Sequence, residues 1–277
     1  MKTYYFYRLD TQEDKEKITK LEKLGVKFFE KTKQSKILPA MVNLYIYTDD
    51  PLAKDVVQIM KGHKYLSAIG TEFSKEDYDN ANLLKMEPDW LHQYPQPEDT
   101  HIEWESIVYD LSKYCSECGV GKIQKAPFHM RREPQWGNRH IFGLNWVFDE
   151  FFVKPGIWEI IFKPKKIDCL PVIQHRTGLS MKTVVQLKIN KVLETSLEME
   201  DYPFEVCKVC KRKKYSALSV GYFPRPKSFP KNFHIVRSQE YFGSGAEARN
   251  AVLISKELYS EIKKEKLKSL EFKVVKN

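Results

Sequence analysis

Residues 113–122, KYCSECGVGK, contain two cysteines three positions apart and a glycine directly after the second cysteine. This CxxCG pattern is typical of a zinc knuckle, in which a tight turn directs both sulfurs at one point and backbone N–H groups can hydrogen-bond the thiolates. One knuckle supplies two ligands, whereas a structural Zn²⁺ takes four. A second pair is therefore expected, and residues 205–211, EVCKVCK, provide it.

The two pairs predict a single structural zinc ion with a closed set of cysteine ligands. Between them lie 88 residues, and closing a loop of that length costs about 4 kcal/mol. Structural zinc contributes about 10 kcal/mol or more near neutral pH, so the separation does not exclude a shared ion. A complete set of cysteines also leaves no open position for catalysis at the metal. The predicted ligands are Cys115, Cys118, Cys207 and Cys210.

Other interpretations of the cysteines remain open at this stage. A redox-active CxxC normally occurs singly, behind a strand and at the start of a helix, whereas these two copies lie in turn-rich, lysine-rich sequence. Disulfides, two separate metal sites and a lost metal site are the remaining alternatives. The fifth cysteine, Cys169, lies among apolar residues in IDCLP (167–171) and is expected to pack as a small hydrophobic side chain.

Length and composition favour a folded protein of two units. The chain has 277 residues, of which 42% are hydrophobic, and this is enough apolar material for packed cores. It has no run of about 18 apolar residues, and its start, MKTYYFYRLD, lacks the apolar segment of a signal peptide. Paired thiols suit a reducing compartment. We therefore expect a cytoplasmic protein with no membrane partner.

The net charge of +9 is unevenly distributed along the chain. Residues 1–110 hold 15 Lys+Arg against 20 Asp+Glu, and residues 111–277 hold 31 against 17. Because the change falls at the first knuckle, we predict an acidic unit at 1–110 and a basic zinc-ribbon unit at 111–277. Lysines near the knuckles can also be local counter-charges, because zinc held by four thiolates is formally a dianion.

Hydrophobic patterns predict that the first unit is mixed α/β. Residues 86–100 are rich in proline and acidic residues and predict a loop. The alternation of Ile102 and Trp104, followed by Val108, predicts a strand that leads into the first knuckle. The other expected elements are strands at 3–9, 41–47 and 65–73 and helices at about 11–24 and 75–84.

The basic part contains what we interpret as a degenerate duplication, at about 111–175 and 203–277. Each copy runs through a knuckle, a basic-aromatic strand with proline, a polar loop, an apolar strand, a helix and an apolar ending. If the copies pair about a pseudo-twofold axis, each knuckle supplies half of one metal site. Chance similarity of short pieces is the alternative. The predicted fold class is α+β, an N-terminal mixed α/β unit followed by a duplicated strand–helix–strand unit clasped by a split Cys₄ zinc ribbon.

With these pieces, the chain resembles the double-CxxCG motif paralogous family of myxobacteria, immunity-type proteins of polymorphic toxin systems. The resemblance rests on CSECG (115–119), on CKVCK (207–211) and on the closing stretch AVLISKELYSEIKKEKLKSLEFKVV (251–275). It covers about residues 100–277 and departs from the family pattern at Lys211, where the family has glycine. The resemblance implies a cytoplasmic bacterial immunity protein that neutralises a cognate protein toxin by binding it, with one zinc ion serving the scaffold.

The sequence shows no catalytic motif such as GxSxG, HExxH or a Walker A loop, so we expect neither an enzyme nor a small-molecule substrate. Acidic side chains could face a basic toxin surface, and one basic-aromatic cluster could contact a partner or phosphates. The predicted partner-binding residues are Glu98, Asp99, Glu103, Glu105, Arg131, Arg132, Trp136 and Arg139.

The alternative function is that of a nucleic-acid-binding zinc-ribbon protein, in which aromatic side chains stack on bases and cations hold phosphates. Only nine of the 46 basic residues are arginine, the side chain best suited to reading base edges, which does not favour sequence-specific DNA binding. The residues that would carry this function are Arg131, Arg132, Trp136, Arg139, Lys211, Arg212, Lys213, Lys214, Arg225 and Lys227.

Overall fold

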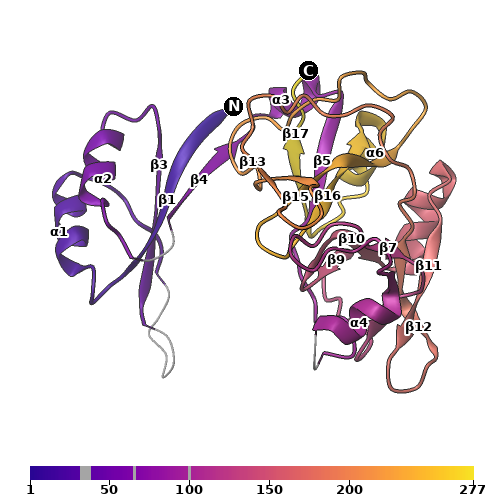
Figure 1. Ribbon diagram of the computed structural model, residues 1–277. Coiled ribbons are helices and arrows are strands. Elements are labelled where there is room, and N and C mark those ends of the chain that lie inside the picture. Colours follow the sequence, from indigo (N-terminus) through magenta and orange to yellow (C-terminus); the bar gives the residue numbers. More distant parts are fainter. Residues whose placement is uncertain (32–38, 65–66, 99–100) are drawn as a thin grey trace. The chain divides into compact units, whose positions relative to one another are not determined.

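Figure 1 shows a computed structural model, which describes residues 1–31, 39–64, 67–98 and 101–277. The chain is a mixed α+β protein, built mostly of strands. It forms two compact units, the first made of residues 1–80 with 218–221 and the second of residues 81–217 with 222–277.

The change of unit falls at residue 80, whereas the charge pattern predicted residue 110. Strand β5 (Leu83–Pro88) is the reason, because it pairs with β16 (Arg249–Ser255) on one side and β17 (Leu270–Val274) on the other. The first 80 residues carry 14 Lys+Arg against 13 Asp+Glu, so the acidic excess of the N-terminal part belongs to residues 81–110 of the second unit.

The first unit is an antiparallel sheet in the order β2-β3-β1-β4, with α1 and α2 on one face (Figure 1). Alternate residues of β1 face the helices, so Leu9 is buried against Leu21 of α1 and Val56 of α2. The bounds are β1 Lys2–Asp10, α1 Lys15–Lys23, β2 Phe29–Lys31, β3 Met41–Tyr47, α2 Ala53–Ile59, β4 Ser67–Glu72 and α3 Lys75–Asn80.

The second unit contains a five-stranded sheet in the order β8-β11-β12-β10-β9, a six-stranded sheet in the order β13-β14-β15-β16-β5-β17, and the pair β6-β7. Besides β5, β16 and β17, its strands are β6 Tyr109–Asp110, β7 Ile123–Gln124, β8 His129–Met130, β9 Ile141–Leu144, β10 Val147–Val153, β11 Cys169–Gln174, β12 Ser180–Leu187, β13 Phe204–Val206, β14 Lys213–Tyr215 and β15 Ile235–Phe242. Its helices are α4 His101–Val108, α5 Pro155–Ile157, the π-helix η1 Trp158–Phe162, the 3₁₀-helix η2 Lys163–Lys165 and α6 Lys256–Lys264.

Four neighbouring strands of the five-stranded sheet correspond one by one to four neighbouring strands of the six-stranded sheet. We call them the first module (β9-β10-β12-β11) and the second module (β15-β16-β5-β17). In the first module one row of paired residues crosses all four strands and consists of Ile141, Val153, Val185 and Pro171. The matching row of the second module consists of Ile235, Ile254, Leu84 and Val274.

In each module, the row residue of one strand is followed directly by the N-cap of a helix. These row residues are Val153 of β10 and Ile254 of β16. Lys154 is the N-cap of α5 and Ser255 is the N-cap of α6, where the Ser255 hydroxyl accepts a hydrogen bond from the Leu258 N–H at 3.2 Å. The two modules therefore share strand order, strand register and the start of the following helix.

Three predictions for residues 75–108 differ from the structure, two in the bounds of an element and one in its type. Helix α3 ends at Asn80 rather than at residue 84, and the expected loop at 86–100 begins with part of β5, because this segment fills the space between β16 and β17. The expected strand before the first knuckle is helix α4. Trp104 and Val108 are four residues apart, so on a helix both are buried on one face, and the apparent alternation was misleading.

The elements predicted for the two copies agree better with the structure. The apolar strand predicted in each copy is part of β10 in the first copy and of β16 in the second, and helical segments follow both. Strands β12 and β15 were not predicted. Part of the strand expected at 65–73 and one predicted contact residue, Asp99, lie outside the described residues. Among the described residues, no helix is both long and apolar enough to cross a membrane.

Candidate metal centre

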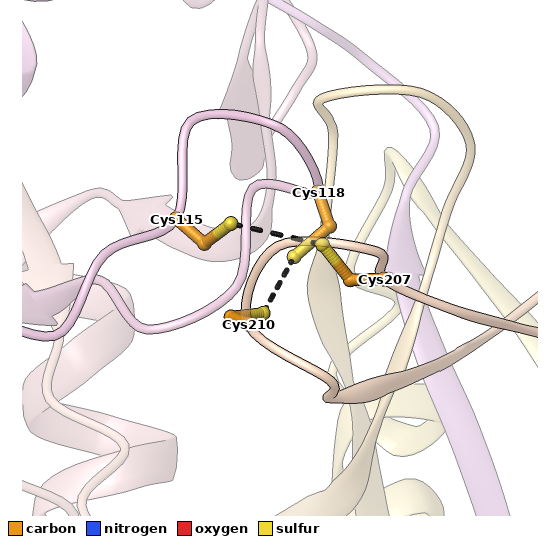
Figure 2. A group of neighbouring side chains, drawn as sticks. All are labelled: Cys115, Cys118, Cys207 and Cys210. Atoms are coloured by element: carbon orange, nitrogen blue, oxygen red, sulfur yellow. Dashed lines mark hydrogen bonds between the residues drawn. The ribbon is translucent and has the colours of Figure 1, made fainter.

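The four predicted cysteines converge in the second unit (Figure 2). Their sulfur atoms all lie within 4.8 Å of one another. The Sγ atoms of Cys115 and Cys207 are 3.8 Å apart, and those of Cys118 and Cys210 are 3.6 Å apart. Each close contact therefore joins one knuckle to the other, and the cluster links two segments that are remote in sequence.

Both knuckles use the same backbone turn. In the first, the Cys115 N–H donates to Val120 O at 3.0 Å and the Gly119 N–H to Cys115 O at 2.8 Å. In the second, the Cys207 N–H donates to Arg212 O and the Lys211 N–H to Cys207 O, both at 3.0 Å. The turn requires a left-handed residue, and both Gly119 (φ +78°) and Lys211 (φ +61°) adopt that conformation. Lys211 stands where the family pattern has glycine, and it forms the same turn although lysine has less backbone freedom than glycine.

The donor set fits a tetrahedral metal ion. Four sulfurs placed about 2.3 Å from a central zinc ion would be about 3.8 Å from one another, close to the two distances given above. The sulfurs are too far apart for disulfide bonds, which need about 2.05 Å. The cluster is also largely shielded from solvent, and Val120, Tyr241 and Ala248 pack against it. Four cysteines in this arrangement could hold a metal ion.

Two basic side chains next to the sulfurs bind the knuckles. Arg212 donates to Cys210 Sγ at 3.3 Å and to Lys113 O at 2.8 Å, so it bridges the two knuckles. Lys214 is buried, and its ammonium donates to Cys118 O and Glu247 O at 3.1 Å each and also to Gly245 O. Arg212 thus places a positive charge directly against a cluster sulfur, whereas Lys214 binds the backbone around the cluster.

The two knuckles differ in thiol acidity. Hydrogen bonds from the Arg212 backbone and side chain lower the pKa of Cys210 to about 6, and backbone hydrogen bonds from Cys210 and Val209 lower the pKa of Cys207. In the first knuckle, burial raises the pKa of Cys118 to about 12. The direction of the pKa shift thus differs between the cysteines of the second knuckle, which accept hydrogen bonds, and Cys118, which is buried.

The acidic residues predicted to contact a partner are not equivalent. Glu98 and Glu103 are exposed, and Glu98 accepts a hydrogen bond from Gln96 at 3.2 Å. Glu105 is buried and its carboxylate lies 2.5 Å from the Lys122 ammonium, so this carboxylate is engaged inside the unit.

The basic-aromatic cluster is partly engaged as well. Arg131 and Arg132 are exposed. Arg139 lies 4.5 Å above the Trp90 ring, and the Trp136 indole donates to Thr183 O at 3.1 Å. The cluster thus contains three exposed arginines, one of which lies over a tryptophan ring, and one tryptophan whose indole N–H is already hydrogen-bonded.

A cluster of three charged side chains near the first knuckle was not predicted from the sequence. A cavity of about 490 Å³ adjoins the first knuckle, and Arg237 at its wall binds Asp149 at 2.9 Å and Glu150 at 2.6 Å. Burial raises the pKa of Glu150 to about 7, although Arg237 opposes this. These residues come from β10 and β15, and no local motif marks them, because only the packing of the two modules brings them together.

No family model matches the chain, and neither a curated protein nor a solved structure matches it. The functional inference therefore depends on the residues of the chain itself.

Proposed function

We propose that the chain is a cytoplasmic immunity-type protein that neutralises a cognate bacterial toxin by binding it, and that one structural zinc ion holds its second unit together. The observation that carries the structural part is the closed set of four sulfurs contributed equally by two distant knuckles. The binding part is supported by the likeness of the knuckles and of the closing stretch to immunity-type proteins.

Zinc is the metal that this donor set favours. Thiolates are soft ligands, and a tetrahedral set of four sulfurs is typical of structural zinc, with iron–sulfur centres as the main competitor. With all four positions taken by cysteine, the ion would have no open site for water or substrate. Its role would be to join the knuckles, with Arg212 and Lys214 offsetting the charge of the thiolates.

We also propose that the two modules descend from a duplication, with an exchange of strands between the copies. The matched rows and the matched turns of the knuckles support this. In this arrangement β5 precedes the first knuckle but lies in the second module, while β12 precedes the second knuckle but lies in the first. This proposal extends each copy beyond its predicted start, the first to include β5 and the second to include β12. Each copy would then supply one knuckle and one exchanged strand, so the zinc ion and the strands would fasten the same two copies together.

The test has a chemical arm and a biological arm. Elemental analysis of the purified chain is expected to give one zinc per chain; two zinc ions per chain would contradict the shared site. Co-expression with the product of the neighbouring gene is expected to restore growth that this product alone suppresses, and the two proteins should co-purify. Absence of both effects would exclude the immunity function.

Nucleic-acid binding is the second candidate, favoured by the exposed Arg131 and Arg132. Two other members of the proposed set form ion pairs on the surface, Arg225 with Glu198 and Lys227 with Glu200, both at 2.9 Å. This function requires binding to generic DNA or RNA at about 50 mM salt, with an affinity that falls steeply as salt rises. No retention at low salt would exclude it.

A further inference from the structure

The second knuckle is bordered by an exposed strand with apolar side chains. Strand β13 lies at the edge of the six-stranded sheet, and all three of its residues are exposed. Phe204 is 48% exposed and Val206 is 52% exposed. In the knuckle turn that follows, Val209 is 70% exposed. Side chains of this kind in solvent, gathered over six positions, are typical of an interaction surface.

The backbone of β13 has hydrogen-bonding groups that no described strand uses. Within the described part of the chain β13 pairs with β14 alone. The Cys207 N–H donates to Arg212 O at 3.0 Å, and the Ser216 N–H donates to Pro203 O at 3.2 Å, so the odd-numbered residues face β14. Because this direction alternates along an antiparallel strand, the N–H and C=O groups of Phe204 and Val206 point away from the sheet. They are free to pair with an added strand.

The surface around β13 carries positive charge that the metal centre does not use. Arg212 and Lys214 bind the knuckles, as described above, but Lys208 and Lys211 have exposed side chains. Lys213 is also exposed, and its ammonium lies 3.9 Å from the centre of the Phe204 ring. Three exposed lysines and one exposed carboxylate, that of Glu205, thus accompany the apolar side chains, and this net positive charge suits an acidic partner.

The first knuckle lacks these features although its turn is the same. Ser116 and Glu117 occupy the positions that Lys208 and Val209 occupy in the second knuckle, and both are exposed polar residues. The backbone turn and the sulfurs serve the metal centre in both knuckles. The turn therefore does not require Lys208 or Val209, and their exposed side chains are available for another role.

We infer that β13 and the second knuckle form a docking edge, which binds an extended acidic segment of the partner protein as an added β-strand. The segment would pair with the outward backbone groups of Phe204 and Val206, place apolar side chains against Val206 and Val209, and place carboxylates near Lys208 and Lys211. This inference rests on the proposed function of protein binding and assigns the surface that performs it.

A protein segment fits this edge better than a nucleic acid does. Valine side chains offer no stacking surface for bases, and the ring of Phe204 already has the Lys213 ammonium close to it. The free backbone groups match the spacing of another peptide strand, whereas a nucleic acid would depend on the lysines alone.

The experiment compares four full-length forms of the chain against the product of the neighbouring gene, by rescue of growth and by calorimetric titration. Lys208→Glu combined with Val209→Asp reverses the charge and removes the apolar tip. Val206→Pro removes one outward N–H without removing a bond to β14. Ser116→Glu places a glutamate at the position of the first knuckle that corresponds to Lys208 and is the positional control; it changes the charge by −1, against −3 for the double variant. Zinc content and thermal unfolding establish that each form is folded.

We expect the double variant and Val206→Pro to weaken binding about tenfold or more and to abolish rescue, while Ser116→Glu behaves like the unmodified chain. If folded forms of both variants bind and rescue as well as the unmodified chain, the docking edge is wrong and the proposed function stands. If the unmodified chain itself neither binds nor rescues, the proposed function fails and the docking edge fails with it.

A labelled single-stranded 20-nucleotide probe, about the length of a few binding sites, tests whether the edge binds nucleic acid instead of a protein segment. We expect no binding of this probe at about 50 mM salt. Binding that is lost on Lys208→Glu but kept on Val209→Asp would overturn the inference in favour of a nucleic-acid surface.

Discussion

Single side chains decide whether the metal centre forms. Each of the four cysteines contributes one sulfur, and two of them come from each knuckle, so the loss of any one leaves an incomplete set. Around the sulfurs, Arg212 and Lys214 hold backbone oxygens of the opposite knuckle. The fifth cysteine, Cys169, lies half-buried in β11 and outside the cluster, where it provides an internal control for loss of a thiol.

We predict that Cys115→Ser removes most of the zinc and lowers the free energy of unfolding of the second unit by about 3 kcal/mol or more, because an oxygen replaces one of four thiolates. Elemental analysis and urea unfolding measure the two effects. Cys169→Ser should retain one zinc per chain and near-normal stability. A zinc content that is unchanged in Cys115→Ser would contradict the assignment of this ligand.

Glu150 gives a pH-dependent prediction. Its pKa is raised from 4.5 to about 7 by burial, so the folded chain binds this proton more tightly than the unfolded chain does. The free energy of unfolding should therefore fall as pH rises through this window, by at most about 1.4 kcal/mol per pH unit. Glu150→Gln lacks the titrating group, so the stability difference between variant and unmodified chain should change with pH in that window.

A metal ion at the four cysteines would add its own pH dependence to the free energy of unfolding. This contribution is the same in the unmodified chain and in Glu150→Gln, so it cancels in the stability difference between them. Urea unfolding of both proteins across the pH window measures that difference. A difference that stays constant from below pH 4.5 to above pH 7 would contradict the raised pKa of Glu150.

At the scale of elements, the two knuckle turns have the same backbone conformation although their sequences differ. The left-handed position is glycine in the first and lysine in the second. A Cβ on Gly119 would lie 2.2 Å from Ala246 O, so only glycine fits there. Lys211 carries a side chain in the same backbone conformation, which costs about 1–2 kcal/mol relative to a right-handed residue.

We predict effects of opposite sign at these two positions. Lys211→Gly should raise the free energy of unfolding by about 0.5–1 kcal/mol, because relief of the left-handed strain exceeds the added backbone entropy of the unfolded chain. Gly119→Ala should lower it by about 2 kcal/mol or more through the overlap with Ala246 O. Thermal unfolding of the zinc-loaded proteins gives both values. A destabilised Lys211→Gly would show that this side chain contributes more than the turn costs.

Strand pairing explains why the elements near residue 100 were predicted less well than those near residue 255. The closing stretch is decided locally, since Ser255 caps α6 and Leu258, Tyr259 and Ile262 form its buried face. By contrast, Leu83–Pro88 has no local signal for a central strand, and it becomes one because β16 and β17 pair with both of its edges. Its partners lie far along the chain, beyond the reach of a local pattern.

At the scale of the whole molecule, the proposed zinc ion belongs to one unit only. All four cysteines lie in the second unit, and so do the five tryptophans, at positions 90, 104, 136, 146 and 158. The first unit has its own core, formed by residues such as Leu9, Leu21 and Leu44. The two units can therefore be followed by separate signals.

We predict that a zinc chelator lowers the unfolding temperature reported by tryptophan fluorescence, since removal of a structural ion removes its binding free energy from the second unit. Far-UV circular dichroism should retain a second transition from the first unit at an unchanged temperature. The Cys115→Ser variant should show the same separation without chelator. A single transition that shifts as a whole on chelation would contradict the independence of the first unit.

The sequence by itself determined which four cysteines come together, the presence of two knuckles, and the strand and helix at the end of the chain. These are local patterns of chemistry and periodicity, which a short stretch carries without help from the rest. Only the tertiary structure decided the division at residue 80, the placement of β5 in the second module and of β12 in the first, the burial of Glu105 and the exposed edge at β13. Each of these depends on which distant segment pairs with or covers the residue, because burial and strand pairing are properties of contacts and not of single positions.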